Sequence, residues 1–309
     1  MTANVLRAQL LFVYGKVFHE TLQAGVQVNF PFSEIIFEAE TKFQRVSYVR
    51  TEAFGRALFI DDIINSSEAD EFVYHEGIVH PAMMRAARRK SALIIGGGEG
   101  ATLREILKYK SIERAVMVDI DEELVRLCQR HLTDVYGDPW QDPRVQLHFG
   151  DGREFVERGE KFDAIIIDLN EPTEDSPARR LYTKEFYELV RAALNPGGVI
   201  SVQSEWIHMP FHVDLSATMA AVFGGVRTVE VNIPCFMMPT AFNLCSVEAA
   251  QLDVTPERID ELIAENDLQL SYYNGEVDRK ISIIPPYLQK MKASGGRVFS
   301  DAELPDYYE

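Results

Sequence analysis

The feature that most constrains the fold is residues 92–121, ALIIGGGEGATLREILKYKSIERAVMVDID. Residues 92–95 form a short apolar run without alternation, which is typical of a parallel strand buried on both faces. Four glycines follow at positions 96, 97, 98 and 100, then a predicted helix over 101–108 and a second apolar strand over 115–118 that ends at Asp119. This order predicts a βαβ unit that binds a nucleoside.

Three features of this unit indicate the kind of nucleoside. Gly96 and Gly98 let the backbone turn tightly and approach a ligand. Asp119 follows the glycines by about 20 residues, where a carboxylate can accept both hydroxyls of a ribose. Glu99 lies inside the turn and would repel a pyrophosphate, which favours a cationic nucleoside such as an adenosyl sulfonium over a dinucleotide. A plain tight turn is the alternative explanation of the glycines.

Composition limits the remaining classes. The 309 residues are 46% hydrophobic and 26% charged, as in globular proteins with one large or two modest domains. No apolar run approaches the roughly 20 residues that span a bilayer, and no signal peptide is apparent, so we expect a cytoplasmic protein without a membrane partner. The net charge of −17 argues against nucleic acid and permits attraction of polycations, although acidic charge also simply promotes solubility.

The N-terminal part predicts a small β domain. Short β runs cover 34–39, 43–50 and 56–60, whereas the first thirty residues show no clear period. The run Ser66 to Glu71 has hydroxyls followed by acids, which predicts a helix start. That helix is expected to reach about His80, with Pro81 opening another helical stretch. We place the domain boundary near Ala82, giving an N-terminal β domain over 1–81 and a catalytic domain over 82–309.

Polar residues follow three further predicted strands of the second domain. The strands over 145–149, 162–167 and 199–203 are followed or ended by Asp151, by Asp168 with Glu171, and by Gln203 with Glu205. The pattern predicts an α/β fold with a doubly wound, mostly parallel sheet, in which ligands bind beyond the carboxyl ends of the strands. Asp151 accepts a hydrogen bond from an adenine amino group or caps the following helix, and the loop at Asp168 is either catalytic or merely a solvated acidic loop.

An acidic crevice without a metal-spaced His/Cys set favours a cationic substrate. Cys128, Cys235 and Cys245 are too few and too scattered for a disulfide framework or a metal site, so we expect no metal. If the donor is an adenosyl sulfonium and the acceptor an amine, Asp168 takes the amine's proton directly or through Tyr74 or water, while Glu171 and Glu205 hold further ammonium groups. Glu99 would pair with the donor's ammonium and repel a methionine carboxylate. The alternatives are a methyltransferase that uses intact S-adenosylmethionine and a non-enzymatic nucleoside sensor.

Several motifs in one order resemble the spermidine synthase family of aminopropyltransferases. They are DEFVYHEGIVHPAM, IIGGGEGATLREILKY, VMVDID, GDGREF, DLNEP, LYTKEFY, LNPGG, QSEWIH and YYNGEV. The resemblance implies an N-terminal β domain on a Rossmann-like, methyltransferase-like domain, in homodimers or homotetramers. It also implies transfer of an aminopropyl group from decarboxylated S-adenosylmethionine, a co-substrate rather than a cofactor, to an amine, with release of 5'-methylthioadenosine.

The resemblance also implies roles for individual residues. Gln44 and His75 would contact the donor, Glu99 its amino group, Asp119 its ribose, and Asp151 with Gly152 its adenine; Asp168 would be the base, and Tyr74, Glu171 and Gln203 would line the acceptor side.

The sequence departs from the putrescine-using pattern in three places. It has GGGEG for the usual GGGDG and DLNEP for the usual DSSDP or DSTDP. Where those enzymes carry IPxYPSG, residues 233–239 read IPCFMMP, so that Phe236 contributes to a more apolar acceptor wall. The DLNEP loop looks more like members that act on agmatine or longer acceptors, including thermospermine synthases, and QSEWIH looks like the spermidine synthases. Putrescine, agmatine and spermidine therefore all stay open as acceptors.

Overall fold

A computed structural model describes residues 16–23, 25–170, 172 and 176–306. The chain divides into two compact units. The first comprises the described residues up to Glu71 together with Ile233–Met237, and the second comprises Phe72–Asn232 and the described residues from Met238 onward. The division lies earlier than the predicted boundary at residues 81 and 82, which falls inside a helix.

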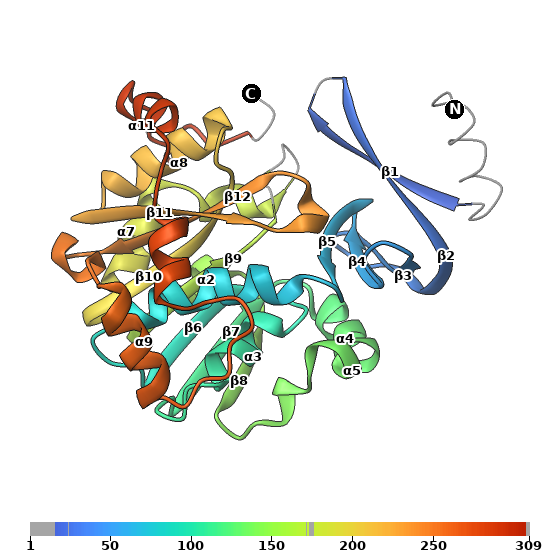
Figure 1. Cartoon of the computed structure of the whole chain (residues 1–309), viewed down its shortest axis with the longest axis horizontal. Coiled ribbons are helices and arrows are strands. Elements are labelled where there is room, and N and C mark those ends of the chain that lie inside the picture. The colour runs from blue at the N-terminus through green and yellow to red at the C-terminus, as the bar shows by residue number, and fades with distance from the viewer. Residues whose placement is uncertain (1–15, 24, 171, 173–175, 307–309) are drawn as a thin grey trace. The chain divides into compact units, whose positions relative to one another are not determined.

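The first unit contains a five-stranded antiparallel sheet in the order β1-β2-β3-β4-β5 (Figure 1). Its strands are β1 (Lys16–Gln23), β2 (Val26–Glu40), β3 (Arg45–Thr51), β4 (Arg56–Ile60) and β5 (Ile63–Ser67). The three predicted β runs are confirmed, and β2 begins well before the run expected at residue 34. The carboxylate of Glu20 on β1 accepts a hydrogen bond from the backbone N–H of Ile64 on β5.

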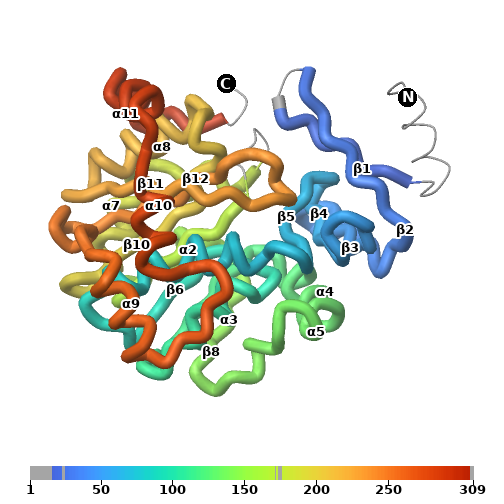
Figure 2. The backbone as a smooth tube through the Cα atoms, in the orientation of Figure 1, coloured from blue at the N-terminus to red at the C-terminus, as the bar shows by residue number. Residues whose placement is uncertain are grey.

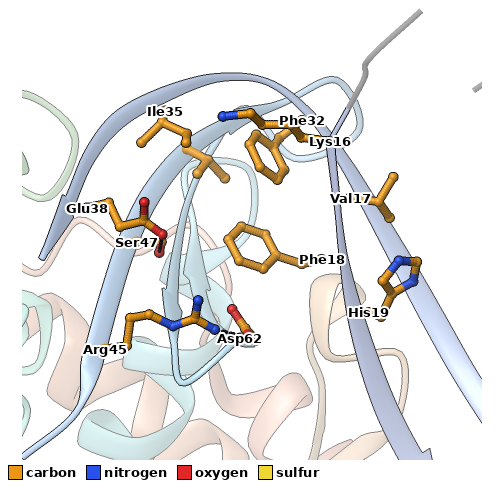
Figure 3. A pocket seen from close by; sticks show the side chains of 11 residues that line it. Lys16, Val17, Phe18, His19, Phe32, Ile35, Glu38, Arg45, Ser47 and Asp62 are labelled. Atoms are coloured by element: carbon orange, nitrogen blue, oxygen red, sulfur yellow. Dashed lines mark hydrogen bonds and ion pairs between the residues drawn. The ribbon is translucent and has the colours of Figure 1, made fainter. Parts of the chain in front are cut away.

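Aromatic side chains of this sheet pack against one another. The rings of Phe18 and Phe59 stack with their centroids 4.3 Å apart. A cavity of about 460 Å³ lies beside Phe18 and Phe32 and is rimmed by Arg45 and Asp62, which form an ion pair (Figure 3). None of its lining residues is a predicted site residue.

The helix start predicted at Ser66 is wrong. Ser66 and Ser67 belong to β5, and α2 runs from Glu71 to Arg85. The hydroxyl of Ser67 donates to Asp70 Oδ1 at 2.7 Å instead of capping a helix at that point. Pro81 does not open a second helix, because α2 continues through it.

The second unit is built on a seven-stranded sheet in the order β11-β12-β10-β9-β6-β7-β8. Its strands are β6 (Ser91–Gly96), β7 (Arg114–Asp119), β8 (Val145–Phe149), β9 (Phe162–Asp168), β10 (Leu194–Trp206), β11 (Gly225–Asn232) and β12 (Pro239–Ser246). Strands β6 to β10 pair in parallel, and β12 pairs antiparallel with β10 and β11. The doubly wound, mostly parallel sheet is confirmed.

Helices connect and cover these strands. They are α3 (Ala101–Leu107), α4 (Glu122–His131), α5 (Thr133–Tyr136), α6 (Gly152–Val156), α7 (Lys184–Ala192), α8 (Pro210–Ala220), α9 (Pro256–Glu265), α10 (Gly275–Ile281) and α11 (Pro286–Ala293). Asp121 and Thr183 cap two of these helices: the N–H of Leu124 in α4 donates to Asp121, and the N–H of Phe186 in α7 donates to Thr183.

The sheet is apolar on both faces, as its unalternating strands require. One face packs against α6, α7 and α8 through a core that includes Ile95, Val118, Ile167 and Phe186. The opposite face carries α2, where a Cβ at Gly77 would touch side chains of β11 and β12. Figure 2 shows the chain from α9 through α10 passing close to α2.

In the described part of the chain, no helix is long and apolar enough to cross a membrane. The thiols of Cys128, Cys235 and Cys245 are all buried and unbridged.

Candidate active site

The glycine turn after β6 is built around the end of β9. Gly96 and Gly97 have φ of 83° and 69°, in the left-handed region that favours glycine. The Gly97 N–H donates to the carbonyl of Asp168 at 3.0 Å. A Cβ on Gly96 would lie 2.0 Å from that same oxygen, so the close approach of the two strand ends requires glycine.

Asp119 lies at the end of β7 beside this turn, as its spacing predicted. A Cβ on Gly98 would be 2.8 Å from Asp119 Oδ2, and the Asp121 N–H donates to Asp119 Oδ1 at 2.8 Å. The pKa of Asp119 is raised to about 7, chiefly by burial and also by the carboxylates of Asp121 and Asp168, against the lowering effect of that hydrogen bond. One carboxylate oxygen thus has a backbone donor, and the other faces the glycine turn.

Asp168 ends β9 and is half-buried. Its Oδ1 accepts a hydrogen bond from the Tyr74 hydroxyl at 2.6 Å, and its Oδ2 accepts one from the Thr102 hydroxyl at 2.6 Å. Sequence reasoning missed Thr102, although its position in the first turn of the helix after the glycines was a usable signal. Two hydroxyl donors therefore orient the carboxylate of Asp168 from opposite sides.

Tyr74 projects from α2 and remains a phenol. Its ring makes edge contacts with His75 and Phe242, with centroids 5.1 and 5.2 Å away. Burial raises the pKa of Tyr74 well above its usual value, and the negative charges of Asp168, Glu99 and Glu205 raise it further. At neutral pH the hydroxyl keeps its proton and donates it in a hydrogen bond to Asp168.

Glu99 of the glycine turn pairs with His75. Oε1 of Glu99 lies 2.5 Å from Nε2 of His75, and the two side chains are 8% and 1% exposed. The pair brings together two residues predicted to contact the donor. The carboxylates of Glu99 and Asp119 both raise the pKa of the Cys128 thiol, after the larger effect of burial.

Gln203 and Glu205 follow one another at the end of β10. Gln203 is 9% exposed, and its Oε1 has no hydrogen-bond partner among the residues that the structure describes. Glu205 is 2% exposed and has a φ of 61°. Since its charge acts on Tyr74, the end of β10 lies near the same group of side chains.

Asp151 caps α6. One of its carboxylate oxygens accepts hydrogen bonds from the N–H groups of Arg153 and Glu154, at 2.7 and 3.3 Å. Gly152 packs so closely against Ile95 that a Cβ would lie 2.6 Å from a methyl carbon. The capping alternative is therefore confirmed, and the adenine contact stays a prediction.

The roles predicted for three further residues are not tested by this geometry. Gln44 and Phe236 belong to the first unit, and Glu171 lies outside the described residues. Their predicted roles stay predictions.

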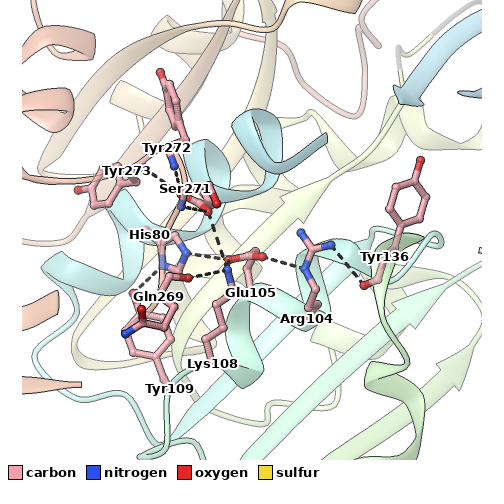
Figure 4. A network of polar contacts seen from close by, with 11 residues as sticks. His80, Arg104, Glu105, Lys108, Tyr109, Tyr136, Gln269, Ser271, Tyr272 and Tyr273 are labelled. Carbon is pink, nitrogen blue, oxygen red and sulfur yellow. Dashed lines mark hydrogen bonds and ion pairs between the residues drawn. The ribbon is translucent and has the colours of Figure 1, made fainter. Parts of the chain in front are cut away.

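A buried polar network fixes the helix that carries Tyr74 and His75. The carboxylate of Glu76 accepts hydrogen bonds from three consecutive backbone N–H groups at 2.8 to 2.9 Å, those of Ser271, Tyr272 and Tyr273. One turn further along α2, His80 lies between Tyr109 and Glu105 (Figure 4). Burial opposes the charge on Glu105, yet His80, Arg104 and Lys108 lower the pKa of Glu105 far below its usual value.

The arrangement suits a positively charged substrate. Four carboxylates, those of Glu99, Asp119, Asp168 and Glu205, come from four strand ends. No group of three or more His, Cys, Asp or Glu residues in the described part of the chain could hold a metal ion. The four carboxylates offer proton acceptance and charge complementarity to a cation.

Known proteins resemble the chain in sequence and in fold. Residues 71–253 match the family described as spermine/spermidine synthase domain, and residues 16–68 match the spermidine synthase tetramerisation domain. Polyamine aminopropyltransferase 2 of Pseudomonas aeruginosa is 37% identical over 273 residues, which cover 86% of this chain and 78% of that protein. The polyamine aminopropyltransferase of Pyrobaculum calidifontis is 36% identical over 272 residues, which cover 86% of this chain and 94% of that protein.

A solved structure shares the fold. It is a crystal structure of spermidine synthase in complex with the transition-state analogue AdoDATO. It aligns with a TM-score of 0.81 at 26% identity and covers 90% of this chain and 94% of that chain.

Proposed function

Because the chain belongs to the spermidine synthase family, we propose that it transfers the aminopropyl group of decarboxylated S-adenosylmethionine to an amine acceptor and releases 5'-methylthioadenosine. The observation that carries this proposal is the Asp168 carboxylate, held by Tyr74 and Thr102 beside the glycine turn. The amine nitrogen attacks the carbon next to sulfur, the carbon–sulfur bond breaks with its electron pair going to sulfur, and Asp168 accepts the proton that the amine loses. Alignment of nitrogen with carbon supplies much of the acceleration, since a sulfonium is a good leaving group.

The donor side is proposed from the residues around the turn. Gly96 and Gly98 permit close approach, Asp119 accepts the ribose hydroxyls, and Asp151 with Gly152 contacts the adenine. Glu99 binds the donor's ammonium next to His75, and Gln44 of the first unit adds a further contact. The donor is a co-substrate, and we propose no other cofactor.

The acceptor side is proposed to comprise Tyr74, Gln203 and Glu205, with Glu171 and Phe236. The carboxylates of Glu171 and Glu205 bind the ammonium groups of the acceptor that do not react. The DLNEP loop favours agmatine or a longer acceptor, and QSEWIH favours the acceptor of spermidine synthases, putrescine.

Assembly and location complete the proposal. The match of residues 16–68 to a tetramerisation domain supports a homo-oligomer, either a dimer or a tetramer. We place the enzyme in the cytoplasm.

The experiment that tests the function is a mass assay with a panel of amines. The protein is incubated with decarboxylated S-adenosylmethionine and, separately, intact S-adenosylmethionine, in the presence of putrescine, agmatine, cadaverine, spermidine or spermine. We expect at least one amine to gain an aminopropyl group from the decarboxylated donor. Gain of a methyl group from the intact donor would instead support a methyltransferase, and methylthioadenosine binding without any amine product would support a sensor.

Glu99→Gln is expected to weaken the preference for the decarboxylated donor. The carboxylate pairs with the donor's ammonium and repels the extra carboxylate of S-adenosylmethionine. Loss of a charged hydrogen bond of roughly 1.5–3 kcal/mol should reduce the ratio of the two affinities by about tenfold or more. Competition between the two donors, measured by calorimetry, checks this. Glu99→Asp keeps the charge and serves as the control; an unchanged preference in Glu99→Gln would contradict the assignment.

Binding of methylthioadenosine is expected to strengthen as the pH rises through 7. The pKa of Asp119 is raised to about 7, so its carboxyl is largely protonated below this pH, whereas accepting two ribose hydroxyls favours the ionised form. Affinity should therefore increase about tenfold between roughly pH 6 and pH 8. Calorimetry across this range tests it, and Asp119→Asn should bind more weakly and lose the pH dependence. A pH-independent affinity of the wild-type protein would remove Asp119 from the ribose site.

A further inference from the structure

The end of β10 contains a bulge that carries two of the proposed acceptor residues. Pairing with β12 is regular up to Gln203, opposite Phe242, and resumes at Trp206, opposite Thr240, so that the register shifts at Ser204 and Glu205. Glu205 adopts a φ of 61°, which few residues other than glycine adopt. Such bulges commonly re-aim side chains next to active sites.

His212 on α8 forms a hydrogen bond with the backbone of this bulge. Its Nδ1 lies 3.0 Å from the carbonyl oxygen of Ser204, and its side chain is fully buried. A carbonyl oxygen only accepts, so Nδ1 carries the proton and Nε2 is the acceptor in a neutral imidazole. The pKa of His212 is lowered to about 3, chiefly by burial and also by the charge of Lys292, against the raising effect of the hydrogen bond to Ser204.

A chain of hydrogen bonds fixes this tautomer from the other side. Lys292 on α11 donates to the Thr228 hydroxyl, which donates to Asn243 Oδ1 at 2.6 Å. The amide nitrogen of Asn243 donates to the Ser216 hydroxyl at 3.1 Å, and this hydroxyl lies 3.5 Å from His212 Nε2. Every member donates toward His212, and the chain ends on the Ser204 carbonyl between Gln203 and Glu205.

We propose that His212 is a positioning residue for the amine acceptor, because its hydrogen bond to the Ser204 carbonyl holds the bulge that presents Gln203 and Glu205. This inference rests on the proposed function, in which those two residues bind the amine. The donor contacts lie on other strands. Loss of the hydrogen bond from His212 should therefore lower the affinity for the amine and leave the affinity for the nucleoside unchanged.

Two amide substitutions separate the two ring nitrogens. In His212→Asn the side-chain nitrogen takes the place of Nδ1 and can still donate to Ser204. In His212→Gln the amide reaches the place of Nε2 instead and serves Ser216. Both variants leave a polar group in the same buried site.

The test measures amine affinity by calorimetry on the full-length protein saturated with methylthioadenosine, together with the KM values of amine and donor. In His212→Gln we expect amine affinity to fall about five- to tenfold, on the scale of one lost hydrogen bond, with methylthioadenosine affinity unchanged. In His212→Asn we expect a change of less than about threefold. Each variant is informative alone if the other does not fold.

Three results would overturn the proposal: an amine affinity in His212→Gln equal to that of the wild type, a fall in His212→Asn as large as in His212→Gln, or an equal loss of nucleoside affinity. Failure of the proposed function is distinguishable, because the wild-type protein itself would then bind no amine or transfer no aminopropyl group.

Discussion

Asp168→Asn is expected to lower turnover by about 10²-fold or more, the usual scale for loss of a general base. The amide keeps the size of the carboxylate but cannot take a proton from the attacking amine. Methylthioadenosine affinity should stay within about twofold, because the proposed nucleoside contacts come from Asp119 and Asp151. Turnover under saturating substrates and calorimetry with methylthioadenosine measure the two effects separately.

Thr102→Val provides a matched comparison for that variant. It removes one of the two hydroxyls that donate to Asp168 and leaves the carboxylate in place. Its loss of turnover should be well below that of Asp168→Asn. Unchanged turnover in Asp168→Asn, or a larger loss in Thr102→Val, would remove Asp168 from the role of base.

Arg85→Met is expected to destabilise the protein by about 3–5 kcal/mol, the range for breaking a buried ion pair. Arg85 lies on α2 and donates to both carboxylate oxygens of Asp278, at 2.9 and 2.8 Å, and also to the backbone carbonyls of Pro81 and Leu252. The guanidinium is fully buried, and Asp278 is 3% exposed. The substitution leaves the charge of Asp278 buried; in the described part of the chain, the Tyr273 hydroxyl, 2.6 Å away, is then the remaining hydrogen-bond partner of its side chain.

The double variant Arg85→Met with Asp278→Leu is the control for this prediction. It removes both charges, so its free energy of unfolding should lie closer to the wild-type value than that of Arg85→Met alone. Urea unfolding followed by circular dichroism gives both values. If the free energy of unfolding of Arg85→Met fell by less than about 1 kcal/mol, the assignment of this ion pair as a major contact between α2 and α10 would be contradicted.

The strand ends were predictable from sequence because a small number of physical rules determine them. Buried parallel strands have unalternating apolar runs, and their carboxyl ends meet along one edge of the sheet. Asp119 and Asp168 follow such runs directly, and the structure brings both beside the glycine turn. The order of elements also predicted the doubly wound, mostly parallel sheet, whereas the antiparallel pairing of β12 with β10 and β11 was not predicted.

Local signals failed where tertiary pairing decides the conformation. Ser66 and Ser67 look like helix caps in sequence, yet pairing with β4 makes them part of a strand. Pro81 looks like a helix start, yet Glu76, His80 and Arg85 hold α2 on both sides of it through partners far along the chain.

The residues missed in the sequence depend on tertiary contacts. Thr102 reaches Asp168 across 66 positions, so its place in the first turn of the helix after the glycines marks a residue near the site but does not name its partner. The role proposed for His212 depends on its contact with Ser204, eight residues earlier, in a bulge that the sequence did not predict. Asp151 had two open explanations, and only coordinates could show that it caps α6.

The central claim is that the acidic strand ends bind an adenosyl donor and point its reactive carbon at Asp168. A crystal structure of the protein with methylthioadenosine and an amine tests this most directly. We expect the ribose hydroxyls on Asp119 and the amine nitrogen within hydrogen-bond distance of Asp168. A nucleoside bound at another place, or with its sulfur turned away from Asp168, would contradict the account.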